Sequence, residues 1–404
     1  MSISTVLRLR DGFGLDHLYV EQMELPALGP TEVHVRFHAA SLNYRDLSVA
    51  LGHYNPKMEL PRILGSDAAG EIIAVGDKVL SLKPGDRVAS LFFQTWQAGE
   101  ITQATGKSAL GGPVDGVFAT DRILAETGLI RIPDTLSFEQ AATLPCAAVT
   151  AWNALVEKGS LHAGQTVVIL GTGGVSLFGL QIAKAHGAKV ILTSSSDEKL
   201  ERGKALGADE TINYKTTPDW DTEVLRLTGN LGADHILEVG GSGTMERSLN
   251  AVRIGGHVHL IGVLSDPGKG VDILSVLRKS IYLNGIYVGS RAMFDRLNAA
   301  IAINEIQPVI DRVSRCNRPG PHLSISKAAA TSARLSWRCN VSRKEISVAY
   351  PAPVRCAHAP KPDSLCDFLA FAGMAPSQTN PIRAANPSSH AITSSASVGP
   401  NWPC

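Results

Sequence analysis

Residues Gln165 to Lys184, QTVVILGTGGVSLFGLQIAK, decide the fold that we expect for this chain. The β-branched and apolar run 166–170 predicts a buried strand, and the glycine-rich turn 171–174 ends it. Apolar side chains then recur at helical spacing: Val175, Phe178 and Ile182. This order is typical of the first unit of a dinucleotide-binding domain, because glycine N–H groups and a helix N-terminus accept a pyrophosphate. The predicted cofactor contacts here are Gly171, Gly173, Gly174 and Val175.

The pattern after this stretch supports the same interpretation. The third position of the strict G-x-G-x-x-G fingerprint is Ser176, so the glycine turn alone also fits a packing turn. Further strands are predicted at 189–193, 234–239 and 257–261, with a helix at 197–206. Alternating strands and helices predict a parallel, doubly wound sheet. Ligands lie at the carboxyl ends of such strands, which places Gly240 and Gly262 beside the cofactor.

The residues after the second strand bear on the choice of cofactor. NAD sites usually place an acidic residue there for the ribose 2′-hydroxyl, but this strand ends in Thr193 and serines 194–196. Asp197 follows at the expected position of a helix N-cap. Ser195, Lys199 and Arg202 suit a 2′-phosphate, so NADP(H) is favoured and NAD(H) is the alternative. Lys199 and Arg202 also fit a solvated helix face.

Composition narrows the class of protein. The chain has 404 residues, of which 44% are apolar, enough for two domains or more. A net charge of +1 argues against nucleic acid and anionic membrane as partners. No segment reads as a membrane span or a signal peptide, so we expect a cytoplasmic protein. Only one of the six cysteines, Cys146, precedes residue 316, which excludes a disulfide framework before that point.

The first 125 residues are predicted to be rich in β-strands. Short alternating runs such as 32–37 are separated by glycine and proline, which favours a small barrel or sandwich. A second strand is expected within 63–73, and Pro84-Gly85-Asp86 predicts a turn. Residues 111–119 are interpreted as another glycine-punctuated strand.

These segments carry a resemblance to the medium-chain dehydrogenase/reductase superfamily, in particular its zinc-free quinone-oxidoreductase-like and alcohol-dehydrogenase-like members. The resemblance covers residues 1 to about 313, in order along the chain. The matching motifs are SLNYRD at 41–46, GHY at 52–54, 61–70, 83–88, AAVTAW at 147–152, 171–176 and LGAD at 206–209.

The resemblance implies a fold of two domains with a cleft between them. It predicts a GroES-like β-barrel catalytic domain at 1–125 and a Rossmann NAD(P)-binding domain at 126–290. The chain would begin its return to the catalytic domain at 291–313, and 314–404 would be a disordered tail outside the family. By the same resemblance, further cofactor contacts would be Thr150, Tyr214, Ile261, Gly262 and Val263. Family members pair the strand at Ile281–Val288 with a second copy, which implies a homodimer.

The resemblance also raises the question of a catalytic zinc. Zinc-dependent members have a cysteine where this chain has Asn43, and a His-Glu pair at Ser66-Asp67. Neither an amide nor a hydroxyl is a good zinc ligand. The cysteines of the family's structural zinc site are also absent from 92–117. His34, His38 and His53 are interpreted as ordinary core or surface residues, so we predict no metal.

Without a metal, the expected reaction is hydride transfer between nicotinamide C4 and a quinone, enone, aldehyde or alcohol. Charge developing on the substrate oxygen needs a hydrogen-bond donor, and the predicted candidates are Asn43, Tyr44 and Tyr54. Arg45 and Asp46 are interpreted as a structural pair. The alternatives are a protein that binds the cofactor with little turnover and, less compatible with the barrel motifs, a Rossmann methyltransferase.

The segment after Val313 departs from the family pattern. It holds 11 of the 22 prolines and five of the six cysteines. The degenerate codons of 323–333 permit, in another frame, a Leu-Glu-Ser-Gly sequence like the family's, so we hypothesise a frameshift near codon 314. The family continues at this point with an amphipathic helix and a closing apolar strand. Their absence would leave apolar surface exposed and a strand unpaired, at a cost of several kcal/mol against a stability of about 5–15 kcal/mol. Sequencing the coding DNA separates a frameshift from a natural extension.

Overall fold

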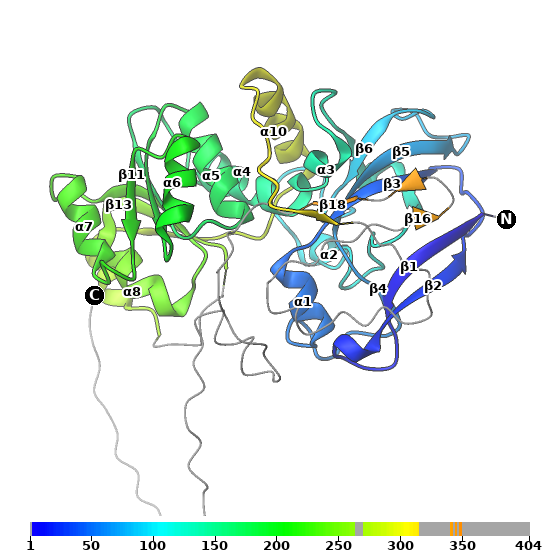
Figure 1. Cartoon of the computed structure of the whole chain (residues 1–404), viewed down its shortest axis with the longest axis horizontal. Coiled ribbons are helices and arrows are strands. Elements are labelled where there is room, and N and C mark those ends of the chain that lie inside the picture. The colour runs from blue at the N-terminus through cyan, green and yellow to red at the C-terminus, as the bar shows by residue number, and fades with distance from the viewer. Residues whose placement is uncertain (1, 263–269, 315–339, 342–343, 346, 350–404) are drawn as a thin grey trace, which may run out of the picture.

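A computed structural model describes residues 2–262, 270–314, 340–341, 344–345 and 347–349. Two domains lie side by side in Figure 1, a β-rich domain in blue and cyan and a layered α/β domain in green. The expected fold class, a GroES-like domain beside a parallel-sheet Rossmann domain, is confirmed. The predicted tail, 314–404, lies almost entirely outside the described residues.

The green domain is built on a six-stranded sheet in which every described pairing is parallel. The strand order is β11-β10-β9-β12-β13-β14, so β9 lies at the centre and the order reverses between β9 and β12. This is where open parallel sheets bind nucleotides. The strands are β9 (Thr166–Ile169), β10 (Lys189–Ser194), β11 (Glu210–Asn213), β12 (Ala233–Glu238), β13 (Val252–Leu260) and β14 (Tyr282–Gly285).

Helices cover both faces of this sheet because alternate residues of the buried strands point to opposite sides. Val167 and Ile169 share one apolar cluster with α5 and α6, whereas Val168 belongs to a second cluster with α7 and α8. The helices are α5 (Gly174–Ala185), α6 (Asp197–Ala205), α7 (Trp220–Leu227), α8 (Ser242–Ala251) and α9 (Ile273–Arg278). The sheet is therefore the middle of three layers.

The β-rich domain holds two sheets. One runs β2-β1-β4, and the larger follows β15-β18-β3-β5-β6-β8, with β7 also paired to β3. The strands are β1 (Ile3–Leu9), β2 (Leu18–Glu24), β3 (Glu32–Ser41), β4 (Arg62–Ile63), β5 (Asp67–Val75), β6 (Arg87–Ser90), β7 (Asp121–Ala125) and β8 (Leu129–Arg131). Short helices fill the connections: η1 (Leu15–His17), α1 (Tyr44–Ala50), α2 (Gln103–Gly106), η2 (Glu126–Gly128) and α3 (Phe138–Ala141).

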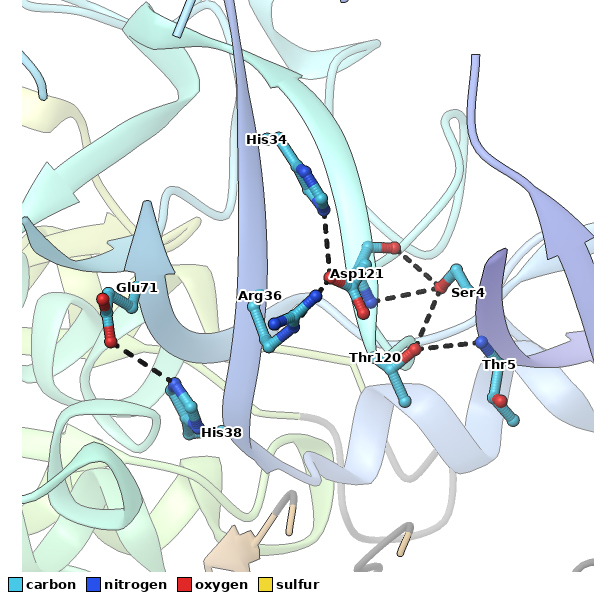
Figure 2. Close-up of polar contacts among 8 residues, drawn as sticks. All are labelled: Ser4, Thr5, His34, Arg36, His38, Glu71, Thr120 and Asp121. Atoms are coloured by element: carbon cyan, nitrogen blue, oxygen red, sulfur yellow. Dashed lines mark hydrogen bonds and ion pairs between the residues drawn. The ribbon is translucent and has the colours of Figure 1, made fainter. Parts of the chain in front are cut away.

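A buried carboxylate joins three strands of this domain (Figure 2). Asp121 Oδ1 lies 3.0 Å from both His34 Nε2 and Arg36 Nε, and the Ser4 hydroxyl donates to the Asp121 carbonyl at 2.7 Å. Burial disfavours the charged form of this carboxyl, but the hydrogen bond from His34 and the charge of Arg36 outweigh it and hold its pKa below the usual value. The network links β1, β3 and β7, and His34 thus has a structural partner.

One helical run connects the domains. It comprises η3 (Leu144–Ala148), α4 (Val149–Trp152) and η4 (Asn153–Lys158), and α10 (Arg291–Ile303) packs against it. The apolar cluster around this run also includes Phe92 and Phe93 of the β-rich domain. The two domains therefore share one continuous core.

Two expectations about the β-rich domain were wrong. Residues 111–119 form a loop with isolated bridges, because Gly111 has a φ of +67° and Gly116 packs on the Leu64 and Gly65 carbonyls. The strand expected to stay unpaired has a partner, since β18 (Ser347–Ala349) runs parallel to β3 and antiparallel to β15 (Val313–Ser314). A separate ribbon joins β16 (Asn340–Val341) and β17 (Lys344–Glu345).

Candidate cofactor and substrate site

The glycine turn after β9 forms an open cradle at the N-terminus of α5. Gly171 has a φ of +72°, and a Cβ added at Gly171 or Gly173 would meet nothing within 4 Å. Gly173 is the N-cap, so Gly174 and Val175 begin the helix and their N–H groups have no intrahelical partner. Ser176, at the imperfect fingerprint position, is buried and donates to the Leu170 carbonyl at 2.8 Å. The chain thus provides open space beside helix N–H groups, which suits a pyrophosphate.

The end of β10 carries the residues considered for the adenosine ribose. Ser195 directly follows the strand, and the backbone N–H of Tyr214 donates to the Ser194 carbonyl at 3.0 Å, so these two predicted residues lie close together. Asp197 is not the N-cap as expected, because Ser196 occupies that position. Arg202 forms an ion pair with Glu198 at 3.0 Å. Arg202 therefore already has an acidic partner.

The carboxyl ends of β12 and β13 meet at a buried glutamate. Glu238 Oε1 accepts hydrogen bonds from the N–H groups of Gly240 and Gly241 at 2.8 and 2.9 Å. The N–H of Ile261 donates to the Glu238 carbonyl, and a Cβ at Gly262 would lie 2.3 Å from the Val239 carbonyl oxygen. The predicted contacts Gly240, Ile261 and Gly262 thus sit in two adjoining loops at one edge of the sheet. Val263, the remaining predicted contact there, lies outside the described residues.

The predicted substrate-binding residues come from the β-rich domain. Asn43 is the N-cap of α1, and its N–H donates to Asp46 Oδ2 at 2.7 Å. Tyr44 and Tyr54 are 48% and 39% exposed, so both hydroxyl-bearing rings are accessible. Arg45 does not pair mainly with Asp46. Its guanidinium instead lies 4.8 Å above the ring of Tyr54 and donates to the Leu110 carbonyl.

A hydrogen bond between two tyrosine hydroxyls crosses from one domain to the other. The Tyr54 hydroxyl meets that of Tyr287, just past β14, and the Tyr287 ring packs edge-on against Phe93 at 4.9 Å. Burial, together with Tyr54, raises the pKa of the Tyr287 hydroxyl. The N–H of Ile286 donates to the Leu260 carbonyl at 3.0 Å, so this pair sits at the carboxyl edge of the sheet, near Ile261.

Two buried acids and a thiol lie beneath Asn43. Asp67 accepts from the Ser66 hydroxyl at 2.6 Å and from the Cys146 N–H at 2.9 Å. Burial, with a further contribution from the negative charge of Asp46, raises the pKa of Asp67 to about 7. Burial likewise raises the pKa of Asp46 to about 6, against the lowering effect of Arg45.

Cys146 lies at the junction with the helical run. Burial, and then the nearby Asp67, raises the pKa of the Cys146 thiol well above its usual value, so the thiol stays protonated. Thr150, which the resemblance placed near the cofactor, is buried one turn further along and hydrogen-bonds this thiol. Thr150 therefore contacts the Cys146 thiol.

Sequence reasoning missed Asp67, Cys146 and Tyr287 as site residues. The sequence pattern at Ser66-Asp67 bears only on zinc, and Cys146 directly precedes the motif at 147–152. Tyr287 is 233 residues from Tyr54 in sequence, so no local pattern indicates their contact. A signal was available for Asp67, because an acid within an apolar strand needs a partner.

The residues around Cys146 and Asp67 fit a zinc ion poorly. Cys146 and Asp67 are possible ligands, but the neighbouring polar side chains are the amide of Asn43 and the hydroxyl of Ser66. In the described part of the chain, no three Cys, His, Asp or Glu side chains of this cleft come within metal-ligand spacing.

Comparison with known proteins gives two family matches. Residues 29–134 match the alcohol dehydrogenase GroES-like domain, and residues 174–303 match the zinc-binding dehydrogenase family. A zinc-type alcohol dehydrogenase-like protein of Schizosaccharomyces pombe is 44% identical over 307 residues, covering 74% of this chain and 89% of that protein. A quinone oxidoreductase of Pseudomonas aeruginosa is 34% identical over 312 residues, covering 77% and 89%.

Solved structures agree with this fold. A Sinorhizobium meliloti protein assigned as an alcohol dehydrogenase superposes with a TM-score of 0.74 at 38% identity, covering 86% of this chain and 99% of that one.

Within the described residues, no helix combines the length and the apolar character needed to cross a bilayer.

Asp67 generates a prediction about stability and pH. Its raised pKa means that the folded state binds a proton more tightly than the unfolded state, so folding should lose free energy as pH rises from about 4 to about 7. Asp67→Asn mimics the protonated, uncharged carboxyl. The asparagine amide can also accept a hydrogen bond from the Cys146 N–H and donate one to the Ser66 hydroxyl oxygen. We expect the variant to gain a few kcal/mol relative to wild type between pH 4 and pH 8, measured by urea unfolding across that range.

The control is Asp77→Asn, a change at an acid in a turn of the same domain, which should leave the pH dependence unaltered. Parallel stability curves for wild type and Asp67→Asn would contradict the assigned protonation state.

Proposed function

The chain belongs to the medium-chain dehydrogenase/reductase superfamily, and from this we propose that it is an NAD(P)H-dependent oxidoreductase. The reaction would transfer a hydride between nicotinamide C4 and a quinone, enone, aldehyde or alcohol. The relatives named above, a zinc-type alcohol dehydrogenase-like protein and a quinone oxidoreductase, support that class of chemistry. The observation that carries the proposal is the open glycine cradle before α5, on the same sheet edge as the Tyr54–Tyr287 pair.

The protein's part in this reaction would be to hold the cofactor and stabilise charge on the substrate oxygen. The nicotinamide would lie near Ile261 and Gly262, with the pyrophosphate at Gly171–Val175. Tyr54 would donate to the substrate oxygen while its own oxygen accepts from Tyr287, which strengthens the donor. Asn43 and Tyr44 are the other proposed contacts of the substrate.

We propose a preference for NADP(H) over NAD(H). Ser195 and Tyr214 adjoin the end of β10, where the adenosine ribose would lie, and Lys199 is on the first turns of α6. Arg202 supports this preference less than its sequence position indicated, because it forms an ion pair with Glu198. Thr150 and Gly240 complete the proposed cofactor set.

We further propose that no zinc acts in the cleft. The support is the donor set itself, which offers an amide and a hydroxyl at two of the positions around Cys146 and Asp67. Metal analysis of purified Cys146→Ser should therefore give the same zinc content as wild type.

Titration with both reduced coenzymes tests the proposed function. We expect NADPH to bind at least about tenfold more tightly than NADH, and Lys199→Ala to lose most of that preference, since one cation–phosphate contact contributes about 1.5–3 kcal/mol. The measurement is coenzyme fluorescence, followed by absorbance loss at 340 nm with a panel of quinones, enones and aldehydes. Lys204→Ala, a change at a lysine paired to Glu201 on the same helix, is the matched control.

Failure to bind either coenzyme would refute the proposal. Binding without turnover of any panel member would favour the alternative, a cofactor-binding protein with little activity.

Tyr54 generates a prediction about catalysis. Tyr54→Phe removes the proposed donor but keeps the ring beneath Arg45, so kcat should fall about 100-fold with the coenzyme Kd unchanged. Tyr287→Phe keeps its packing on Phe93 and should cost less, because Tyr54 can still donate. Tyr19→Phe, at a ring on β2, is the control. Equal kcat in Tyr54→Phe and Tyr19→Phe would exclude Tyr54 as the donor.

We also propose a homodimer through the strand predicted at Ile281–Val288. Only Tyr282–Gly285 of it is a strand, and β14 is the edge of the sheet. Apolar side chains exposed beside this edge support the proposal: Ile273 (77%), Leu277 (70%) and Tyr282 (59%). Such a surface favours pairing with another chain.

Leu277→Glu should shift the dimer toward monomer by at least about tenfold in Kd, because it buries a charge in an apolar contact. Sedimentation equilibrium measures this, with Ile303→Glu on the exposed side of α10 as the control. A wild-type protein that is monomeric at micromolar concentration would refute the dimer.

A further inference from the structure

Three histidines gather on one face of the nucleotide-binding sheet, away from the cleft. His257 and His259 are two residues apart on β13, so both point to the same side, and His235 is the register partner of His257 on β12. One nitrogen from each ring lies within 4.8 Å of those from the other two. His235 and His259 are fully buried, whereas His257 is partly exposed. The cluster thus has two interior positions and one that reaches solvent.

Two side-chain carboxamides lie within hydrogen-bonding distance of the histidine rings. Gln165 Oε1 lies 3.1 Å from His235 Nε2, and the carboxamide nitrogen of Asn284 lies 3.2 Å from His257 Nδ1 and 3.5 Å from His259 Nδ1. Because a carbonyl oxygen only accepts, Gln165 requires the proton of His235 on Nε2 and leaves Nδ1 as a lone pair. The lone pair of His235 therefore faces His259.

The nitrogens that face each other are His235 Nδ1 and His259 Nε2, 3.2 Å apart. Two arrangements of the ring hydrogens are compatible with this contact. In the metal-free arrangement His259 Nε2 carries a hydrogen and donates it to His235 Nδ1. If the Asn284 carboxamide turns over, its oxygen accepts from Nδ1–H of His259, and two lone pairs then face one another. In this second arrangement both nitrogens are free to bind one cation that lies to one side of the line joining them.

We propose that His235, His257 and His259 form a binding site for a borderline divalent cation of the zinc class. Three imidazoles are the protein ligands of one established type of zinc site, with the fourth position left to water. Two nitrogens on a tetrahedral zinc lie about 3.3 Å apart, close to the separation of His235 and His259. Gln165 and Asn284 hold the opposite ring nitrogens, which is the usual role of outer residues around metal-bound histidine.

The surroundings favour neutral rings. His235 and His259 are fully buried, which disfavours a charged ring, and metal binding requires the neutral ring. The ring of Tyr282 stacks on His257 at 4.7 Å and restrains it on the solvent side. Imidazole ligands suit zinc, cobalt, nickel and copper, whereas magnesium and calcium prefer oxygen.

The site lies below the cofactor position along the same strand. His257 and His259 precede Ile261 and Gly262 on β13, and His235 precedes Glu238 on β12. The cation would therefore stabilise the packing of β12 and β13 without touching nicotinamide. This inference is independent of the proposed oxidoreductase activity.

Titration of tag-free, chelator-treated full-length protein with Co²⁺ tests the proposal. We expect one equivalent to bind with visible d–d absorption of a tetrahedral site, competed by Zn²⁺, and a higher Tm with Zn²⁺ than without. His257→Asn should weaken Co²⁺ binding by about 100-fold or more, and Asn284→Ala by about 10–100-fold. His257 is partly exposed, so its variant should still fold, which circular dichroism checks.

The controls separate this site from the cleft. His53→Gln, at an exposed histidine of the other domain, and Cys146→Ser should bind Co²⁺ as wild type does. Absence of a saturable visible band in wild type, or its persistence in folded His257→Asn, would overturn the proposal. NADPH titration of the same samples is read separately, so failure of cofactor binding does not affect the outcome.

Discussion

The hydrogen bond from the Cys146 N–H to the Asp67 carboxyl joins the β-rich domain to the helical run that leads into the α/β domain. Asp67 opens β5 of the barrel and Cys146 lies in the first turn of the connecting helical run, so one 2.9 Å contact joins both units. Burying a carboxyl group is costly unless its oxygens are satisfied, and Ser66 satisfies the other oxygen. The contact therefore ties the start of β5 to the start of the helical run.

Local pattern predicted the elements around the nucleotide fold well. The strand at 166–170, the glycine turn and the following helix correspond to β9 and α5, and the helix stop at Gly207 has the expected positive φ. These features depend on neighbours in sequence, which is why the residues alone indicate them. The strand expected within 63–73 is β5, which begins only at Asp67 because Gly65 has a φ of +86° with the Phe118 ring packed against it.

Contacts between distant segments could not be predicted in the same way. The Tyr54–Tyr287 pair and the Cys146–Asp67 bond depend on how two domains dock, and the sequence carries no periodicity for that. The sequence likewise did not indicate that His235, His257 and His259 lie together, although the His-Val-His alternation at 257–259 is present in it. Their proximity depends on the register of β12 against β13, which pairs His235 with His257.

The same histidines help to keep β14, at the edge of the sheet, in register with its neighbour. The β14 strand has only four residues and one strand neighbour, so backbone pairing alone gives it few hydrogen bonds. A side-chain chain runs from Gln165, just before β9, through His235 and His259 to Asn284 on β14, and so crosses four adjacent strands. A one-residue slip of β13 would turn both of its imidazoles to the opposite face and break the two links that His259 makes, to His235 and to Asn284. Because Ile261 and Gly262 continue directly from β13, the same polar side chains also restrain the loop at the carboxyl end of that strand.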